Sequence, residues 1–235
     1  MVTEDVSRRI ALAAVLLTIG TGGTDVASFT RLGGVFTSVM TANITLFGLS
    51  IVLRSGGIAG RTALSFAGYV LGVAAGAWLT GRRARDREAL REQDWPPMVT
   101  VVLGAELVLL AGLTVGWEVS GGHPAGTGQY LLLAVAAIAM GLQSAAVRGL
   151  GAGNFSTTYL TGQLTGIVAG LVTPEQPSWP GWHQVGPLLA LVTGGLLGGV
   201  LIAAAPAALP VITFVPLCLV VAMAVAARRR VGAAG

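Results

Sequence analysis

The stretch GVFTSVMTANIT, residues 34–45, sets the main constraint on how this chain can fold, because it places polar side chains inside a largely apolar sequence. Its polar members are Thr37, Ser38, Thr41, Asn43 and Thr45. A second stretch, NFSTTYLTGQLT at residues 154–165, carries the same pattern 120 positions later, with Thr157, Thr161 and Thr165 aligned to three of the threonines and Gln163 to Asn43. Two copies of one polar segment in an apolar chain indicate an internal repeat.

The composition is typical of a membrane protein. Of the 235 residues, 54% are hydrophobic and 10% are charged, and the mean hydropathy is +0.78. A soluble domain of this size needs far more charge to cover its surface. All 14 basic residues are arginines that gather mainly at the ends of apolar segments, which indicates a topology signal and not a nucleic-acid-binding face. Cys218 is the single cysteine, so a disulfide framework is excluded, and the sequence predicts neither a metal site nor a cofactor.

Eight apolar segments follow one another along the chain and predict an all-α polytopic membrane protein with six to eight transmembrane segments. They cover roughly residues 10–30, 35–53, 62–81, 97–117, 129–150, 156–173, 185–204 and 208–227. A charged loop at 82–96 separates the third segment from the fourth. We expect a single integral membrane domain over residues 1–235, with one repeat over about 8–117 and a second over about 129–228.

Further matches favour duplication over chance similarity between apolar helices. GGTDVASF (22–29) is similar to GLQSAAVR (141–148) at an offset of 119, which aligns Asp25 with Ser144. The third segment has glycines four residues apart at Gly68, Gly72 and Gly76, and the seventh has the same spacing at 194/198 and 195/199. Such spacing allows close helix packing, either inside one protomer or through the third and seventh helices of a homo-oligomer.

The distribution of arginines tests the topology. If all eight segments cross the membrane, the loops on the two sides carry seven arginines each, and neither orientation is favoured. If segments 2 and 6 are broken or re-entrant, six crossings place eleven arginines on one side and three, Arg31, Arg54 and Arg61, on the other. The second distribution agrees with the excess of positive charge on the cytoplasmic side of membrane proteins. We therefore expect inverted repeats with both termini in the cytoplasm.

The threonines of each polar stretch are four residues apart, so on a helix they form one stripe, with Asn43 or Gln163 roughly on the opposite face. An unpaired amide in hydrocarbon costs several kcal/mol, so we expect both segments to be buried at the centre of the protein. The two stripes and the amides, together with Gln143, are candidates to line a substrate path. Alternatively, the hydroxyls bond their own i−4 carbonyls and the amides hold helices together.

Three ionisable residues, Asp25, Glu106 and Arg148, are candidates for proton or ion coupling. Glu106 lies in VTVVLGAELVLLAGL near the middle of the fourth segment, where a carboxylate is costly and marks a functional site by default. The alternative for Glu106 is a structural hydrogen bond or ion pair that locks helices together. Asp25 and Arg148 lie at equivalent places in the two repeats, so one hypothesis pairs them across the pseudo-twofold axis and the other makes each a marker of an interface.

Two further patterns give expectations about local structure. Trp95, Trp117, Trp179 and Trp182 lie at segment ends, which favours interfacial anchoring. The glycines at 20–23 and 149–153 are expected to interrupt the helices that contain them. His123 and His183 lie in loops without companion ligands, so neither is interpreted as a metal ligand.

The stretches GGTDVASFTRLGGVFTSVMTANITLFG and GLQSAAVRGLGAGNFSTTYLTGQLTG resemble the YoaK-like family of bacterial membrane proteins, a domain of unknown function. In that family the first stretch reads approximately as a glycine, a DA pair, a phenylalanine and GGVFTANMTGN, and the second as GxQNAAVR followed by TTxLTG. This chain departs at Val26, Ala42 and Ser144, where alanine, glycine and asparagine are usual, so position 144 lacks the usual amide. The resemblance implies a multi-helix inner-membrane protein associated with the export of small organic molecules, including antibiotics.

Together these features predict a secondary transporter in the bacterial plasma membrane that exports a small organic molecule in exchange for protons. Segments 2 and 6 would line its path, with Asp25 and Glu106 as proton or cation sites and Arg148 as a counter-ion or anion contact. Proton coupling is expected because the sequence has no nucleotide-binding motif such as GxxxxGKS/T. The alternatives are a passive channel and a non-transporting membrane scaffold. A membrane-embedded enzyme is disfavoured because no nucleophile–base set or pair of histidines stands out.

Overall fold

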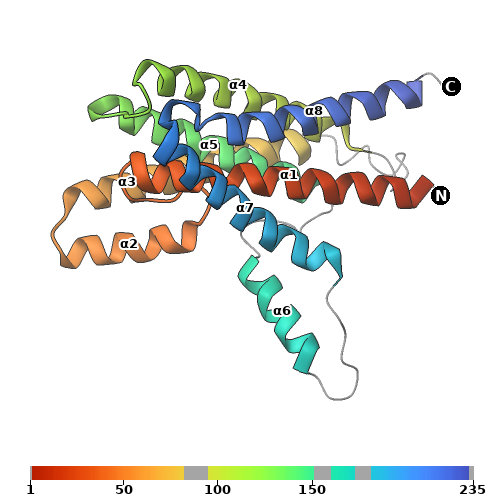
Figure 1. Cartoon of the computed structure of the whole chain (residues 1–235), viewed down its shortest axis with the longest axis horizontal. Helices are drawn as coiled ribbons and strands as arrows, with labels where there is room; N and C mark the ends of the chain where they lie inside the picture. The colour runs from red at the N-terminus through yellow and green to blue at the C-terminus, as the bar shows by residue number, and fades with distance from the viewer. Residues whose placement is uncertain (1, 82–94, 151–159, 173–180, 233–235) are drawn as a thin grey trace.

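The computed structural model describes residues 2–81, 95–150, 160–172 and 181–232, so the predicted loop 82–96 lies almost entirely outside the described residues. The regular secondary structure in these ranges is helical, as predicted. The helices are α1 (Val2–Arg31), α2 (Met40–Val52), α3 (Gly56–Gly81), α4 (Pro97–Val119), α5 (Gly126–Gly149), α6 (Leu160–Val172), α7 (Trp182–Ala204), the 3-10 helix η4 (Pro206–Ala208) and α8 (Val211–Gly232). Most of them form one elongated bundle, from which α6 projects (Figure 1).

Six of the described helices are long and apolar enough to cross a membrane. These spans are Arg8–Arg31, Gly56–Gly81, Pro97–Val119, Gly126–Gly149, Gln184–Ala204 and Pro206–Ala226. The helices α2 and α6 have 13 residues each. At about 1.5 Å per residue each is roughly 20 Å long, which is shorter than the roughly 30 Å hydrocarbon core. The predicted all-α polytopic fold is therefore confirmed, while the re-entrant course of the second and sixth segments stays a prediction. The helix α1 begins at the end of the bundle where α8 ends (Figure 1).

The helices α1 and α5 run antiparallel through the middle of the bundle. The Gln129 amide near the start of α5 donates to the carbonyl of Arg31 at the end of α1, at 2.8 Å. About four turns further along α5, the Gln143 amide donates to the Leu17 carbonyl at 3.1 Å and to the Thr21 hydroxyl at 2.9 Å. These are the most buried of the six spans.

Glycines bring α3 against α5 and α7 against α1. A Cβ atom added at Gly72 would collide with the carbonyl of Ile138 on α5, and one added at Gly194 would collide with the carbonyl of Ile19 on α1. Backbone therefore touches backbone at both crossings, and only glycine leaves room for the contact. Close packing inside the protomer is thus confirmed for Gly68, Gly72, Gly76, Gly194 and Gly198, whereas a Cβ atom added at Gly199 would meet no atom within 4 Å. The use of these glycines between protomers stays a prediction.

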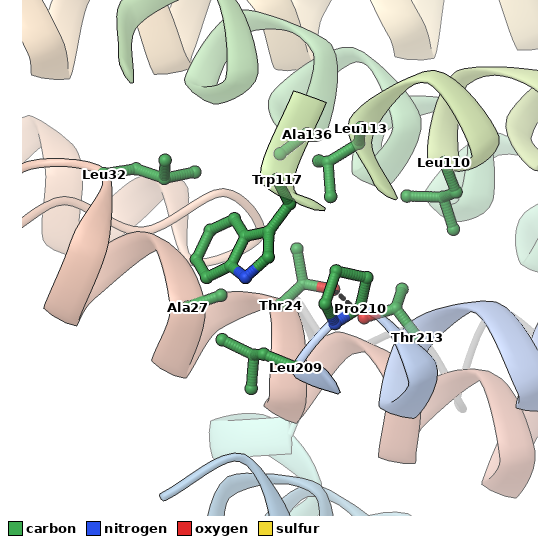
Figure 2. A pocket seen from close by; sticks show the side chains of 10 residues that line it. All are labelled: Thr24, Ala27, Leu32, Leu110, Leu113, Trp117, Ala136, Leu209, Pro210 and Thr213. Carbon is green, nitrogen blue, oxygen red and sulfur yellow. Dashed lines mark hydrogen bonds between the residues drawn. The ribbon is translucent and has the colours of Figure 1, made fainter. Parts of the chain in front are cut away.

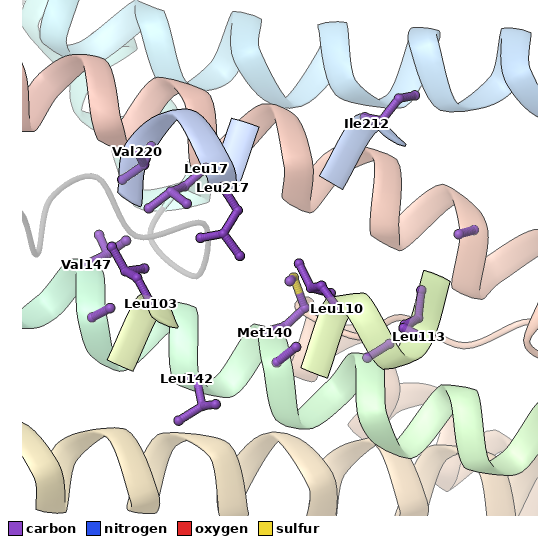
Figure 3. Packing of buried hydrophobic residues seen from close by; sticks show 14 of the residues in the cluster. Leu17, Leu103, Leu110, Leu113, Met140, Leu142, Val147, Ile212, Leu217 and Val220 are labelled. Carbon is purple, nitrogen blue, oxygen red and sulfur yellow. The ribbon is translucent and has the colours of Figure 1, made fainter. Parts of the chain in front are cut away.

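The apolar core lies between α1, α4, α5 and α8. One face of α4 carries the buried side chains Leu103, Leu110 and Leu113, which are 0%, 1% and 8% exposed. Met140 of α5 and Leu217 of α8 belong to the same cluster, and Figure 3 shows these side chains pointing into the space between the helices. Because the buried side chains of α4 recur every three or four residues along the helix, its core-facing side can be recognised from the sequence.

The expectation that both polar segments lie at the centre of the protein is wrong. The helix α2 packs on the outside of α3, while α6 extends outward from α7 (Figure 1). Thr41, Thr45, Thr161 and Thr165 are exposed. Exposure is tolerated because the Thr45 hydroxyl donates to the Thr41 carbonyl at 3.1 Å and the Thr165 hydroxyl to the Thr161 carbonyl at 2.9 Å, so neither needs a partner from another helix.

The expected interruption of α1 at residues 20–23 is also wrong, because α1 is continuous from Val2 to Arg31. The glycines there serve packing. A Cβ atom at Gly22 would collide with the Leu191 carbonyl of α7, and one at Gly23 would collide with Ile212 of α8. At the second position, α5 ends at Gly149, and residues 151–153 lie outside the described part of the chain.

Candidate functional site

The carboxylate of Asp25 holds the connection between α1 and α2. It is 6% exposed, and its Oδ1 accepts from the Thr37 amide at 2.9 Å, the Thr37 hydroxyl at 3.1 Å and the Ser38 amide at 3.0 Å. Its Oδ2 accepts from the Ser38 hydroxyl. Gly33 and Gly34, with φ of 107° and 79°, follow the end of α1 and adopt a backbone conformation that favours glycine. They allow the chain to reverse, so that residues 37 and 38 come back to Asp25.

The amide of Asn43 holds the same connection from its other side. Its Oδ1 accepts from the Phe36 N–H at 3.0 Å, and its Nδ2 donates to the Phe36 carbonyl at 2.6 Å. Nδ2 also lies 3.2 Å from the hydroxyl oxygen of Ser65 on α3, and that hydroxyl donates to the Phe36 carbonyl at 2.6 Å. The bonds of Thr37, Asn43 and Asp25 are therefore those of a clasp that fixes α2 to α1 and α3. Their predicted roles in a substrate path or in coupling stay predictions.

The residues aligned with this region in the second half of the chain show a different pattern where the structure describes them. Gln163 is half-buried and Thr157 lies outside the described residues. Ser144, which the sequence aligns with Asp25, accepts a hydrogen bond from the Tyr69 hydroxyl on α3 at 2.9 Å. Gln143 is 6% exposed and joins α5 to α1 through the bonds given above. Of the predicted path residues, Gln143 lies at the centre of the bundle.

Arg148 does not pair with Asp25, and this hypothesis is wrong. Arg148 is exposed at the end of α5. The hydrogen bonds between the two helices place Gln129 beside Arg31, and Gln143 beside Leu17 and Thr21. Because α1 and α5 are antiparallel, Asp25 is therefore at the same depth as about residue 136 of α5. The twelve residues from there to Arg148 correspond to about 18 Å along the helix axis. The clasp with Thr37 and Ser38 takes the place of the expected ion pair.

Glu106 is the outstanding polar group of the core. It is 0% exposed, and neither carboxyl oxygen has a hydrogen-bond partner among the described residues. Near one end of the contact between α4 and α5, Val99 of α4 lies beside Gly149 of α5, and near the other end Gly116 lies beside Leu132. Glu106 is therefore about halfway along this contact. A charged carboxylate in such a position is strongly disfavoured, so the group must take a proton or meet a ligand with a complementary charge. This agrees with its predicted position near the middle of the segment.

A small cavity lies against Leu110, Leu113 and Trp117 of α4 (Figure 2), residues that share one helix face with Glu106 by their spacing in the sequence. Its volume is about 20 Å³, which is enough for about one water molecule. Its lining comes from α1, α4, α5 and the η4–α8 region, and consists of Thr24, Ala27, Leu32, Leu110, Leu113, Trp117, Ala136, Leu209, Pro210 and Thr213. The hydroxyls of Thr24 and Thr213 are 2.8 Å apart and hydrogen-bonded to each other at its edge.

Trp117 was missed as a core residue. It is 1% exposed, and its Nε1–H donates to the Pro206 carbonyl at 2.8 Å, so the prediction of an interfacial anchor is wrong for this tryptophan. The sequence does contain a signal for its burial. Glu106, Leu110, Leu113 and Trp117 follow at spacings of four, three and four residues, which places all of them on one face of a helix. Among the described residues, no three His, Cys, Asp or Glu side chains come together as a metal site.

Comparison with known proteins gives a family and one clear relative. A family model described as "Protein of unknown function (DUF1275)" matches residues 13–226. The chain is 30% identical to the UPF0700 transmembrane protein YoaK of Bacillus subtilis (strain 168) over an alignment that covers 65% of this chain and 63% of that protein. The match thus spans less than two thirds of the relative's length. No solved structure matches the chain at a significant level.

Proposed function

The chain belongs to the DUF1275 family of membrane proteins, and we propose that it is a secondary transporter that exports a small organic molecule across the bacterial plasma membrane in exchange for protons. The six spans make it a multi-pass integral membrane protein. Two features support the transport proposal. One is the relation between its two halves, and the other is the buried carboxyl group of Glu106, which carries the argument for coupling.

The two glycine crossings correspond residue by residue. Gly72 on α3 contacts Ile138 on α5, and Gly194 on α7 contacts Ile19 on α1. Adding 122 to the residue number on α3 and subtracting 119 from the residue number on α5 converts the first contact into the second. The same arithmetic converts the contact Tyr69–Gly141 into Leu191–Gly22. The offset of 119 is the one that relates GGTDVASF to GLQSAAVR. Independent helix packing has no reason to keep these two offsets, whereas two copies of one unit do.

The directions of the helices favour inverted copies. The first helices of the two halves, α1 and α5, run antiparallel. The packing of α4 on α5 has its counterpart in the packing of α8 on α1. Inverted repeats of this kind are common in secondary transporters, where the two copies exchange conformations and open a central site to each side in turn. The substrate would bind where the copies meet, between α1, α4, α5 and α8.

Glu106 is suited to couple this exchange to protons. A protonated carboxyl group is tolerated inside the closed core, while a charged one requires water or a partner. The Glu106 carboxyl group should therefore release its proton only when the surrounding core opens and admits water or a charged partner. Asp25 is less suited to this role because its oxygens already accept hydrogen bonds from Thr37 and Ser38.

Reconstituted vesicles with an imposed pH gradient provide the test. A thermal-shift screen of the purified protein first identifies compounds that stabilise it, and these compounds are then assayed for gradient-driven uptake. Glu106→Gln should keep the fold, because the amide preserves shape and polarity, and should abolish uphill transport. The control is Glu118→Gln, which changes an exposed acid on the same helix and should transport normally.

Uphill transport by the Glu106→Gln protein would remove this residue from the coupling mechanism. Movement of substrate without movement of protons would indicate the passive channel. If no stabilising compound crosses the bilayer, the scaffold is the better interpretation.

The orientation of the protein is a separate part of the proposal. Both ends of the chain are placed in the cytoplasm because eleven of the 14 arginines fall on that side. Single cysteines at positions 93 and 123, in a Cys218→Ser background, should be labelled from opposite sides of the membrane by an impermeant maleimide. Labelling of both from one side would contradict the arrangement of six crossings, and labelling of position 93 from outside the cell would contradict the cytoplasmic placement of the two ends.

A further inference from the structure

We propose that Glu106 and Trp117 form the two ends of a binding site for a monovalent, lipophilic organic cation, which competes with a proton for the Glu106 carboxyl group. This inference rests on the proposed function and specifies its substrate class. It starts from the face of α4 that carries Glu106, Leu110, Leu113 and Trp117, all of which are at most 8% exposed.

The geometry of that face fits an elongated amphipathic molecule. Trp117 lies eleven positions after Glu106, which corresponds to about 16 Å along the helix axis. The cavity lies against Leu110, Leu113 and Trp117, which follow Glu106 on this face of α4. The small side chains Ala27 and Ala136 also line the cavity, and Figure 2 shows the Trp117 indole among the lining side chains. A charged group at Glu106 would thus have apolar surface and an aromatic ring beyond it.

The charge of the site selects a cation. The charged and titratable groups on the elements packed around α4 are Arg61 and Tyr69 on α3, Tyr130 and Arg148 on α5, and Cys218 and arginines 228–230 on α8. Within the described part of the chain, no group is hydrogen-bonded to the Glu106 oxygens. An anion would be repelled by the ionised carboxylate, and a neutral molecule would leave its charge uncompensated. A cation compensates that charge and also gains from contact with the face of an indole.

Because the site has a single carboxyl group at Glu106, one bound cation should replace one proton. Glu106 is neutral when it carries one proton and is again neutralised when it binds one monovalent cation. The closed cavity, at about 20 Å³, is far smaller than such a molecule. Binding must therefore separate the helices that meet there. The hydrogen bond from Trp117 to the Pro206 carbonyl joins α4 to η4. Movement of η4 and the start of α8 away from α4 would break this bond and enlarge the site.

Isothermal titration calorimetry of the purified full-length protein tests the inference with two probes of the same shape and opposite charge. Tetraphenylphosphonium should bind, and titrations in buffers of different ionisation enthalpy should show release of about one proton per cation over the pH range in which Glu106 is protonated. Tetraphenylborate should bind at least tenfold more weakly. Ethidium serves as a second cation of different shape, so that a poor fit of one probe does not determine the result.

Variants separate the two ends of the site. Glu106→Gln should weaken cation binding at least tenfold and abolish proton release, while Glu118→Gln should change neither. Glu106→Asp keeps the charge, so it should retain proton release with reduced affinity, which a purely structural role of the residue would not predict. Trp117→Phe should lower cation affinity several-fold and leave proton release unchanged.

Three results would overturn the inference: equal binding of the cation and the anion, cation binding without proton release, or binding of neither cation. The proposed function fails separately. If vesicles show Glu106-dependent, proton-driven transport of a neutral or anionic compound while neither cation binds, the transporter proposal stands and the cation assignment is wrong. If the cations bind with proton release but no gradient drives their transport, the site is correct and the transporter proposal is wrong.

Discussion

Replacement of Gly72 by alanine is the most direct test of how the two halves are packed. The new Cβ atom would collide with the Ile138 carbonyl and with the Cα of Gly141, both of which are backbone atoms of α5. Neither can rotate away as a side chain could, so α3 and α5 must separate. Overpacking of a core typically costs about 1–3 kcal/mol. At roughly 2–4 °C per kcal/mol for a chain of this length, the melting temperature should fall by about 2–12 °C.

The counterpart and the control come from the same chain. Gly194→Ala collides with the Ile19 backbone in the same way and should lower the melting temperature by a similar amount. Gly104, inside α4, has no atom within 4 Å of an added Cβ, so Gly104→Ala should be neutral or should stabilise by about 0.5–1 kcal/mol through helix propensity. Thermal unfolding in detergent, followed by intrinsic fluorescence, provides the comparison. If Gly72→Ala is as stable as Gly104→Ala, the backbone contact at this crossing does not exist, and unequal losses at 72 and 194 would argue against matched halves.

Three further changes have distinct expected outcomes. Asn43→Ala removes the partners of the Phe36 N–H and carbonyl, so it should lower unfolding free energy by about 1–3 kcal/mol in chemical denaturation; an unchanged midpoint would contradict the clasp. Asp25→Asn should destabilise the protein by about 1–3 kcal/mol, because the amide nitrogen that replaces one carboxyl oxygen cannot accept a hydrogen bond, while Arg148→Gln should stay within about 0.5 kcal/mol of the parent; equal losses would support an ion pair between Asp25 and Arg148. Glu106→Leu should raise the melting temperature, since a buried polar group without a partner costs about 1–3 kcal/mol, and should abolish transport; a less stable leucine variant would indicate a structural role.

Much of the fold could be predicted because its determinants are local. Span length and hydropathy identify the six long helices, whereas the distribution of arginines, and not hydropathy, sets the second and sixth segments apart. The four-residue glycine spacing indicates close packing, although it does not name the partner helix. The burial of Glu106 follows from its place in an apolar run. For these features the sequence neighbours of a residue determine its surroundings.

The site was harder to predict because its bonds join distant residues. The stripe of threonines suggested a polar lining, but Thr45 and Thr165 satisfy their hydroxyls on their own helices and therefore tolerate exposure. Asn43 binds the backbone of Phe36, a partner that no side-chain pattern reveals. The pairing of Asp25 with Arg148 was based on equivalence in the repeat, and the antiparallel directions of α1 and α5 place the two residues at different depths.

The exchange of packing partners between the halves has a consequence for biogenesis. The main partner of α3 is α5 and that of α1 is α7, so the glycine faces of the first half are covered mainly by helices of the second. A nascent chain that has inserted α1–α4 therefore waits in the bilayer with two unfilled grooves until α5 and then α7 leave the ribosome. Neither half can complete its core alone. Fragments divided in the connection between α4 and α5 should each be degraded in cells and become stable when they are synthesised together.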